Sequence, residues 1–370
     1  MIEPTHHSLA QLLLEHLQTH GPQPFQWFME QALYHPEHGY YASGRAVIGR
    51  QGDFLTNVSV GPLYGRLIGI QMEEMWRRME CPVAFTIVEQ GAANGDFAHD
   101  LLSSLAGAFR EAVRYVIVEP FPAWKSRQVA RLEGFACVAW VDSLSALTPF
   151  TGVHFSNELL DAFPVQRLAF RKGIWIERYV EARGDQIAWC DGPPATGSLP
   201  PPAEEGVETE ICPQRLAWLD ALTARLERGY ILVVDYGFPR EVYHLPERRE
   251  GTLTGYAHHQ RVEDLLQSPG EVDLTAHVEF TSLAEHAATL DLQVAGFTDQ
   301  HHFITALGLQ YFKEGEAAQT PAAQKERRAF MTLMHPQFMG LGFQVMALVK
   351  NMPIRPPLSG FSLAPSLAFQ

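Results

Sequence analysis

The amino-acid sequence predicts an α/β protein built on an open, mostly parallel sheet of the Rossmann type. From about Ala84 onwards, short apolar runs bounded by Gly, Pro and acidic residues alternate with segments of helical periodicity. Such alternation is typical of βαβ units, which place successive strands side by side in one parallel sheet. Several apolar runs are followed directly by polar residues, as expected where parallel strands end at a shared ligand crevice.

Composition narrows the class of protein. The 370 residues carry a formal net charge of -14, which argues against a nucleic-acid binder because phosphate backbones are held by clusters of Lys and Arg. No apolar run approaches the roughly 20 residues that cross a bilayer, so we expect no membrane insertion. The first Lys or Arg is Arg45, so the start of the sequence lacks the basic residues of a secretory signal or mitochondrial presequence. We therefore expect a cytoplasmic location.

The first part of the sequence, residues 1–80, predicts a helical cap region. Apolar residues recur at helical spacing from Leu9 to Leu17, before a break at Gly21-Pro22. The helical texture continues to about Met79, where the strand-like runs take over.

The core sheet is expected from residues 81–164 and 226–351. Two late apolar runs, 292–297 and 343–349, flank a helical stretch and predict an antiparallel pair at one edge of the sheet. Five earlier runs predict strands whose carboxyl ends meet at one crevice. These five runs are residues 85–88, 115–118, 136–140, 152–155 and 230–234.

Residues 165–225 interrupt the core and predict an inserted, β-rich segment. Apolar residues nearly alternate over residues 170–180 around Gly173, a pattern typical of an antiparallel hairpin. The Pro-rich run 192–202 predicts a loop. Residues 352–370 form a second Pro-rich stretch, which we expect to be an extended or disordered tail.

The strongest local motif is Glu89-Gln90-Gly91-Ala92-Ala93-Asn94-Gly95, where a strand enters a Gly-turn before a helix that begins near Asp96. Gly91 and Gly95 allow the backbone to approach a ligand closely. A dinucleotide site needs a third Gly at a helix amino terminus to hold pyrophosphate, and that Gly is missing. The cofactor S-adenosylmethionine has no pyrophosphate, so the motif favours it. An ordinary tight turn between strand and helix is the alternative.

Acidic residues follow the next two strands. Glu119 comes directly after the second strand, where a carboxylate can accept both ribose hydroxyls of an adenosine. Asp142 follows the third strand and is positioned to flank the adenine. The alternatives are a solvated strand-end carboxylate for Glu119 and a helix N-cap for Asp142. The Gly-turn together with Glu119 predicts an adenosine site.

Several further segments occur in one order along the chain: Pro36–Tyr41, Gly52–Thr56, Asn157–Val165, Asp235–Gly237, Asp273–Phe280 and Met339-Gly340. Together they resemble the MidA family of class I S-adenosylmethionine-dependent methyltransferases. The resemblance runs from about His35 to Lys350 and implies a methyltransferase sheet that binds S-adenosylmethionine.

The resemblance also implies candidate cofactor contacts. Asp53 and Thr56 are expected to close over the methionine end of the cofactor, although Gly-Asp also favours an ordinary turn. Two departures from the family pattern are Ala93, where the family has Gly, and Asn57-Val58, where the family has Pro-Glu. The expected cofactor contacts are Glu89, Gly91, Ala93, Gly95, Glu119, Asp142, Asp53 and Thr56.

Mitochondrial members of the MidA family methylate an arginine of a respiratory complex I subunit, so the resemblance implies a protein substrate of that kind. Carboxylates are needed to orient and desolvate a guanidinium. Asn157, Glu158 and Asp161 follow the fourth strand, and the two acids would share one face if the segment turns helically. His277 is a candidate general base or orienting residue. The alternatives are a helix-capping role for the acids and a structural role for His277.

Other readings stay open at this point. They are a small-molecule O- or N-methyltransferase, an assembly protein that binds S-adenosylmethionine without turnover, and a nicotinamide-dependent oxidoreductase, which the missing third Gly disfavours. Adjacent histidines such as His258-His259 have no convergent third ligand, so we expect no metal site. A homodimer is compatible with the sequence.

Overall fold

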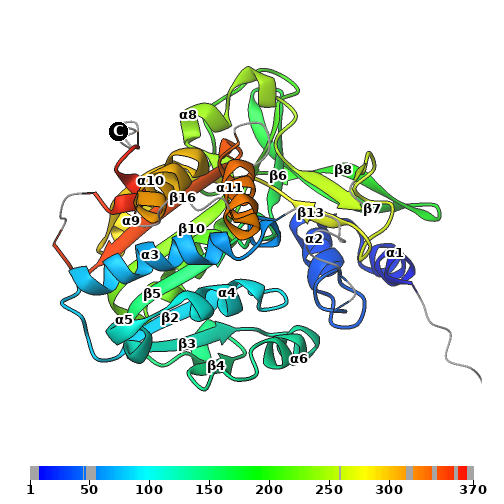
Figure 1. Cartoon of the computed structure of the whole chain (residues 1–370). Coiled ribbons are helices and arrows are strands. Elements are labelled where there is room, and N and C mark those ends of the chain that lie inside the picture. The colour runs from blue at the N-terminus through cyan, green and yellow to red at the C-terminus, as the bar shows by residue number, and fades with distance from the viewer. Residues whose placement is uncertain are drawn as a thin grey trace, which may run out of the picture.

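The computed structural model describes residues 8–44, 46, 56–257, 260–313, 320–335, 340–353 and 357–364. In these residues, helices cover both faces of a central sheet, and a smaller antiparallel sheet lies beside it (Figure 1). The predicted α/β fold class is confirmed.

The central sheet is mostly parallel. Its strand order from one edge to the other is β15 (Leu292–Asp299), β16 (Phe343–Lys350), β10 (Leu226–Phe238), β5 (Phe150–Asn157), β2 (Phe85–Gln90), β3 (Val113–Val118) and β4 (Val138–Val141). β16 runs antiparallel to both of its neighbours, whereas the pairs from β10 to β4 are parallel. The predicted antiparallel pair at one edge of the sheet is therefore confirmed.

The central sheet separates two apolar cores. Helices of the first core are α3 (Leu63–Arg78), α4 (Asp96–Ser104), α5 (Gly107–Ala112), α10 (Gln300–Lys313) and α11 (Pro321–Met334), and those of the second are α7 (Pro213–Thr223) and α9 (Phe280–Thr289). Successive residues of a strand point to opposite faces. On β10, Leu232 and Val234 therefore pack in the first core, whereas Ile231 and Val233 pack in the second.

The inserted segment forms the smaller sheet. Its strands are β6 (Gln166–Arg171), β7 (Ile174–Arg183), β8 (Gln186–Pro194) and β9 (Glu208–Ile211), joined by β1 (Gln23–Pro24) from the amino-terminal region. The hairpin predicted around Gly173 is present as β6 and β7. The predicted Pro-rich loop starts later than expected, because β8 pairs with β7 as far as Pro194.

The amino-terminal helices α1 (Leu9–His20) and α2 (Phe25–Tyr34) share an apolar core with this smaller sheet. The ring of Phe25 lies 4.7 Å from that of Trp189 on β8. Short elements complete the fold: η1 (Val58–Val60), α6 (Pro122–Arg131), η2 (Leu144–Ala146), α8 (Arg240–Tyr243), η3 (Pro246–Arg248), β11 (Thr254–Ala257), β12 (Gln260–Arg261), β13 (Asp273–Thr275), β14 (Val278–Glu279) and η5 (Ser359–Phe361).

The Pro-rich tail is not wholly extended, in contrast to the expectation from its composition. Leu358 and Phe361 are buried, and the Phe361 ring lies 5.1 Å from that of Phe303 on α10. The backbone N–H of Gly360 donates to Gln71 Oε1 of α3 at 2.8 Å. Apolar side chains in the tail thus overcame its proline content. Across the described ranges, no helix is long and apolar enough to cross a membrane.

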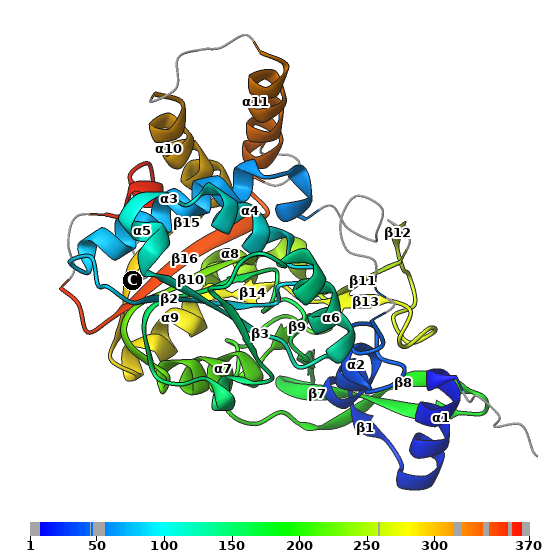
Figure 2. The ribbon, with the colours of Figure 1, turned by 60° about the horizontal axis from the view of Figure 1, so that its bottom comes forward.

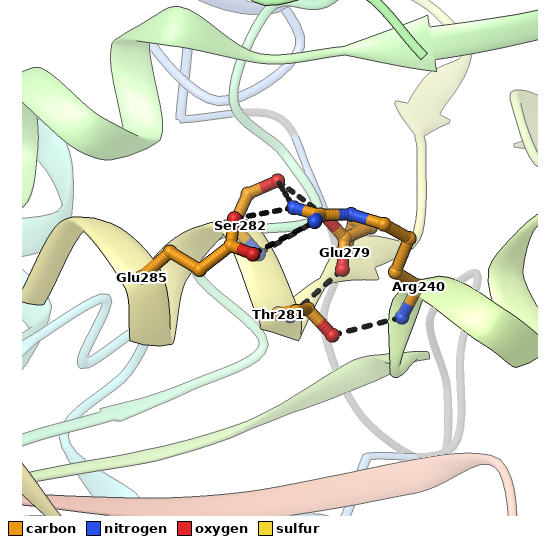
Figure 3. Close-up of polar contacts among 5 residues, drawn as sticks. All are labelled: Arg240, Glu279, Thr281, Ser282 and Glu285. Carbon is orange, nitrogen blue, oxygen red and sulfur yellow. Dashed lines mark hydrogen bonds and ion pairs between the residues drawn. The ribbon is translucent and has the colours of Figure 1, made fainter. Parts of the chain in front are cut away.

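A polar cluster anchors the start of α9 (Figure 3). Glu279 caps the helix by accepting the backbone N–H groups of Thr281 at 2.7 Å and Ser282 at 3.0 Å. Arg240 of α8 donates to the Glu285 carboxylate at 2.8 and 2.5 Å, and to Ser282 Oγ at 3.1 Å. These contacts hold the chain that precedes α9 against the end of β10.

Gly152 marks a close approach of strands in the centre of the sheet. Its φ is +153°, and a Cβ built there would lie 2.0 Å from the carbonyl oxygen of Thr86. We expect Gly152→Ala to lower the free energy of unfolding by about 3 kcal/mol, because β2 and β5 would have to separate. The control is Gly184→Ala in the turn after β7, where φ is +68° and the space is open. That variant should lose only about 1 kcal/mol. Equal losses in urea denaturation would contradict this assignment.

Candidate functional site

The carboxyl ends of β2, β3, β5 and β10 meet at a cavity of about 830 Å³. Parallel strands bring these ends to one edge of the sheet, as the sequence predicted. Residues from the amino-terminal region and from β11 and β13 complete the wall. Of the residues expected from the sequence, Thr56, Glu89, Gly91, Ala93, Glu119, Asn157, Glu158, Asp161 and His277 line the cavity.

The Gly-turn after β2 has a left-handed backbone at three positions. Gly91 has a φ of +82°, and a Cβ there would lie 3.4 Å from the Leu159 side chain, at the cavity wall. Ala93 adopts a φ of +45°, which glycine accepts more readily than alanine. Gly95 has a φ of +84° but faces Gln128 of α6 rather than the cavity. The expectation that Gly95 makes room for the cofactor is therefore not met, and its role is to start α4.

Glu119 presents a held carboxylate to the cavity. Its Oε1 accepts the backbone N–H of Phe121 at 3.0 Å, and its Oε2 accepts Gln128 Nε2 at 2.8 Å. Burial raises the pKa of Glu119, while these two hydrogen bonds act in the opposite direction. Each oxygen has a second lone pair, so the carboxylate can also accept the hydroxyls of a ribose.

Gln128 is a residue that the sequence did not reveal. It is fully buried, and its Nε2 also donates to the carbonyl oxygen of Ala93 at 2.9 Å. Gln128 thus joins the Gly-turn to the acid at the end of the next strand. Because it lies in the middle of α6, its sequence position carries no motif.

Three other predicted cofactor contacts, Glu89, Asp142 and Asp53, differ in where they lie relative to the cavity. Glu89 accepts the hydroxyl of Tyr115 at 2.7 Å, and burial raises the pKa of Glu89 to about 7. Asp142 follows the edge strand β4, is exposed, and lies outside the cavity, where it accepts Ser143 Oγ at 3.0 Å. The expectation that Asp142 flanks the cavity is therefore not met. Asp53 lies outside the described residues.

Glu158 lies at the other end of the cavity, directly after β5. Its Oε1 accepts Asn157 Nδ2 at 2.7 Å and the backbone N–H of Asn57 at 3.4 Å. Burial, followed by repulsion from Asp161, raises the pKa of Glu158 to about 8. Glu158 has a φ of +55°, and residues 158–161 do not form a helix. The two acids therefore reach the cavity from a loop, not from one helical face as the sequence suggested.

Arg215 of α7 ties this loop to the chain that contains His277. Its guanidinium donates to the carbonyl oxygens of Leu160 at 2.8 Å, Ala276 at 2.7 Å and His277 at 2.9 Å. Burial raises the pKa of Asp161 to about 6, and the nearby Arg215 charge opposes that shift. One buried cation thus fixes the two loops that carry the predicted catalytic residues.

His277 lies against Tyr236, with ring centroids 6.1 Å apart and nearly parallel planes. Burial, with the charges of Arg248 and Arg215, lowers the pKa of His277 to about 4. The imidazole is therefore neutral at pH 7, and its buried Nδ1 has no hydrogen-bond partner among the described residues. A neutral ring can orient its neighbours, but it is a weak base.

The sequence did not identify the aromatic wall of this end of the cavity. Tyr34 donates to the carbonyl oxygen of Ala162 at 2.9 Å, and Tyr41 donates to Asp273 Oδ1 at 2.8 Å. Tyr41 and Asp273 both lie in segments that carry the family resemblance. Their pairing across the chain had no local signal.

A metal centre finds no support in the ranges that the structure describes, where no three His, Cys, Asp or Glu side chains converge as ligands. His6-His7 and His258-His259 lie outside those ranges.

The sheet, the Gly-turn and the acid after the second strand define a class I methyltransferase of the Rossmann type. A family model described as "putative S-adenosyl-L-methionine-dependent methyltransferase" matches residues 67–298, and the chain belongs to this family. The chain is thus a methyltransferase whose cofactor is S-adenosylmethionine.

Similar proteins agree with this assignment. The protein arginine methyltransferase NDUFAF7 homolog of Drosophila melanogaster is 27% identical, over 94% of this chain and 86% of that protein. The human mitochondrial protein arginine methyltransferase NDUFAF7 is 24% identical, over 92% of this chain and 82% of that protein. A Burkholderia thailandensis structure bound to S-adenosyl-homocysteine is 28% identical, with a TM-score of 0.85, and the match covers 96% of this chain and 95% of that one.

These findings confirm the resemblance to the MidA family and correct one expectation. The Drosophila and human relatives are mitochondrial proteins, so the cytoplasmic location expected from the sequence is wrong. The residues before Arg45 that suggested it were a poor guide to location.

The raised pKa of Glu158 has a consequence for stability. The pKa of about 8 in the folded protein exceeds the ordinary value of 4.5, so this carboxyl stabilises the fold below pH 4.5 and loses that contribution as the pH rises towards 8. Glutamine carries no charge to bury. We expect the stability of Glu158→Gln relative to the wild type to grow by on the order of 2 kcal/mol between pH 5 and pH 8.

Urea denaturation across this pH range measures the difference. Glu241→Gln, at an exposed position on α8, is the control and should show no such trend. A difference for Glu158→Gln that does not vary with pH would show that the carboxyl is not buried as described.

Proposed function

We propose that this chain transfers a methyl group from S-adenosylmethionine to an arginine side chain of a protein, with a respiratory complex I subunit as the first candidate. The observation that carries the proposal is the cluster of Glu158, Asp161 and Asp273 at one end of the cavity. The names of the Drosophila and human relatives, both protein arginine methyltransferases, support the same substrate class.

The cluster suits a guanidinium for electrostatic reasons. Burial raises the pKa values of Glu158 and Asp161, and repulsion from Asp161 raises that of Glu158 further. An entering cation would favour the ionised form of both acids. Arg215 uses three of its N–H groups on backbone carbonyls. The guanidinium of a substrate arginine would bring its own planar set of N–H donors, which matches the geometry of a carboxylate. An ammonium group has no such planar set.

The cofactor end of the cavity is assigned to the Gly-turn and Glu119. S-adenosylmethionine, when bound, supplies an electrophilic methyl group on its sulfonium sulfur. Glu119 would accept the ribose hydroxyls, while the missing side chain of Gly91 keeps the wall open beside Leu159. Glu89, Ala93, Thr56 and Asp53 complete this proposed cofactor set.

The acceptor end is assigned to Glu158 and Asp161, which would orient the guanidinium towards the methyl group. Asn157 holds the Glu158 carboxylate through its amide at 2.7 Å. As the bond between the attacking nitrogen and the methyl carbon forms, the bond from that carbon to the sulfonium sulfur would break, which leaves S-adenosylhomocysteine. The nitrogen would lose a proton in the same step. Glu158, which the charge of the bound guanidinium keeps ionised, would accept that proton as a general base. His277 acts in this scheme as an orienting neighbour of Tyr236.

Removal of the Glu119 carboxylate tests the cofactor end. We expect Glu119→Ala to weaken S-adenosylmethionine binding by roughly 1.5–3 kcal/mol, the loss typical of hydrogen bonds to a charged group. Asp142→Ala, which removes an exposed carboxylate outside the cavity, should leave the affinity unchanged. Isothermal titration calorimetry measures both variants. Equal affinities for Glu119→Ala and the wild type would exclude the ribose contact.

Glu158→Gln tests the acceptor end, because it keeps the shape of the side chain and removes the charge. We expect turnover to fall by about two orders of magnitude while the affinity for S-adenosylmethionine stays nearly the same. Mass spectrometry of candidate partner proteins, co-expressed with either the wild type or the variant, should find a methylated arginine only with the wild type. A methyl group on a small metabolite, with no protein labelled, would refute the substrate class.

A further inference from the structure

Three side-chain amides, of which those of Asn57 and Gln300 are fully buried, form a continuous hydrogen-bonded chain that ends on Glu158. Gln300 Nε2 donates to Asn57 Oδ1 at 2.8 Å, and Asn57 Nδ2 donates to Asn157 Oδ1 at 3.2 Å. Asn157 Nδ2 then donates to Glu158 Oε1 at 2.7 Å. Every amide in this chain therefore donates towards the carboxylate.

The hydrogen-bonded chain of amides starts where α10 meets α11. Figure 2 shows this pair of helices rising from one side of the molecule. Gln300 is the first residue of α10, and its Nε2 also donates to the carbonyl oxygen of Leu333 near the end of α11 at 3.0 Å. Gln300 Oε1 is buried and has no partner among the described residues. Within the described residues, the Gln300 side chain therefore makes hydrogen bonds only through its Nε2, and these fix the orientation of Asn57.

Asn57 is one of the two positions where the sequence departs from the family's Pro-Glu. Asn57 and Gln300 are both 0% exposed, so each amide would be costly to bury without its partners. The backbone N–H of Asn57 also approaches Glu158 Oε1, at 3.4 Å. The altered segment is thus packed and hydrogen bonded around the proposed catalytic acid.

We propose that Gln300 and Asn57 are positioning residues, which hold the Asn157 amide and the Glu158 carboxylate in one orientation through this directed chain of amides. The inference rests on the proposed function of Glu158. It assigns a role in turnover to the junction of α10 and α11, which does not line the cavity. It also explains why this chain can replace Pro-Glu without leaving the acid unsupported.

The test replaces Gln300 by Met, which has a similar size and no N–H donor. Gln71→Met on α3 is the matched control, because Gln71 is equally buried and binds Gly360 and Glu74 away from the cavity. The first readout needs no acceptor. The free energy of unfolding is measured against pH for the protein with Glu158 and for the same protein with Glu158→Gln. The readout is the pH at which the difference between these two free energies reaches half of its full size.

We expect Gln300→Met to raise this pH by about half a unit to one unit, because the ionised carboxylate loses support, and Gln71→Met to leave it unchanged. The other titratable groups around Glu158 are Asp161 on its own loop, Asp235 and Tyr236 on β10, Tyr64 on α3 and Asp273 on β13. All of them are the same in each compared pair, so the difference reports on Glu158.

The second readout is turnover with the identified acceptor. Gln300→Met should lower kcat about tenfold with the S-adenosylmethionine affinity within twofold, and it should add no further loss in the Glu158→Gln background. The proposal would be overturned if the two losses of kcat multiplied in the double variant. It would also be overturned if Gln300→Met left the pH of the first readout unchanged. If Gln300→Met does not fold, the substitution Asn57→Leu takes its place, because it keeps the backbone N–H and removes both side-chain hydrogen bonds of Asn57. The same outcomes then support or overturn the proposal. Failure of the arginine substrate would leave the first readout intact.

Discussion

The buried carboxylate of Asp235, at the end of β10, organises the functional half of the molecule. It accepts three backbone N–H groups: Leu159 at 3.1 Å, Leu160 at 2.7 Å and Tyr236 at 2.9 Å. The two oxygens of a carboxyl group can accept several N–H groups at once. The loop after β5 is thereby bound to the neighbouring strand. Without that attachment, the left-handed turn at Glu158 would have no fixed position relative to the sheet.

The second support is Arg215, which approaches the same loop from the inserted segment. Its three carbonyl contacts link residue 160, in the loop after β5, to residues 276–277, between β13 and β14. The carboxyl group of Asp235 and the guanidinium of Arg215 thus hold one loop from two sides. The acids of the cavity can stay buried because backbone dipoles, rather than solvent, stabilise the groups around them.

Local patterns in the sequence were sufficient to predict the sheet, and most of the residues proposed from them for the site line the cavity. Strand-end positions such as Glu119 and Asn157 follow directly from βαβ periodicity, and the positive φ of Gly91 is what a Gly-turn implies. The prediction that Asp142 flanks the cavity was not met. The same periodicity places this residue at a strand end, but it does not indicate how far the edge strand lies from the cavity. Gln128 and Gln300 could not be predicted, since each acts through a partner far away in the chain or on another element. The packed tail was missed because proline content masked the two buried side chains Leu358 and Phe361.

The position of β16 in the sheet has a consequence for how the protein is made on the ribosome. β16 lies between β10 and β15, although it is the last of the three to be synthesised. In the described part of the chain, β15 pairs with β16 alone. Until residue 350 has left the exit tunnel, the edge of β10 lies open and β15 has no hydrogen-bonded neighbour. A nascent chain therefore carries an exposed apolar strand edge from the emergence of β10 until that of β16, and an exposed edge of that kind invites association with other chains.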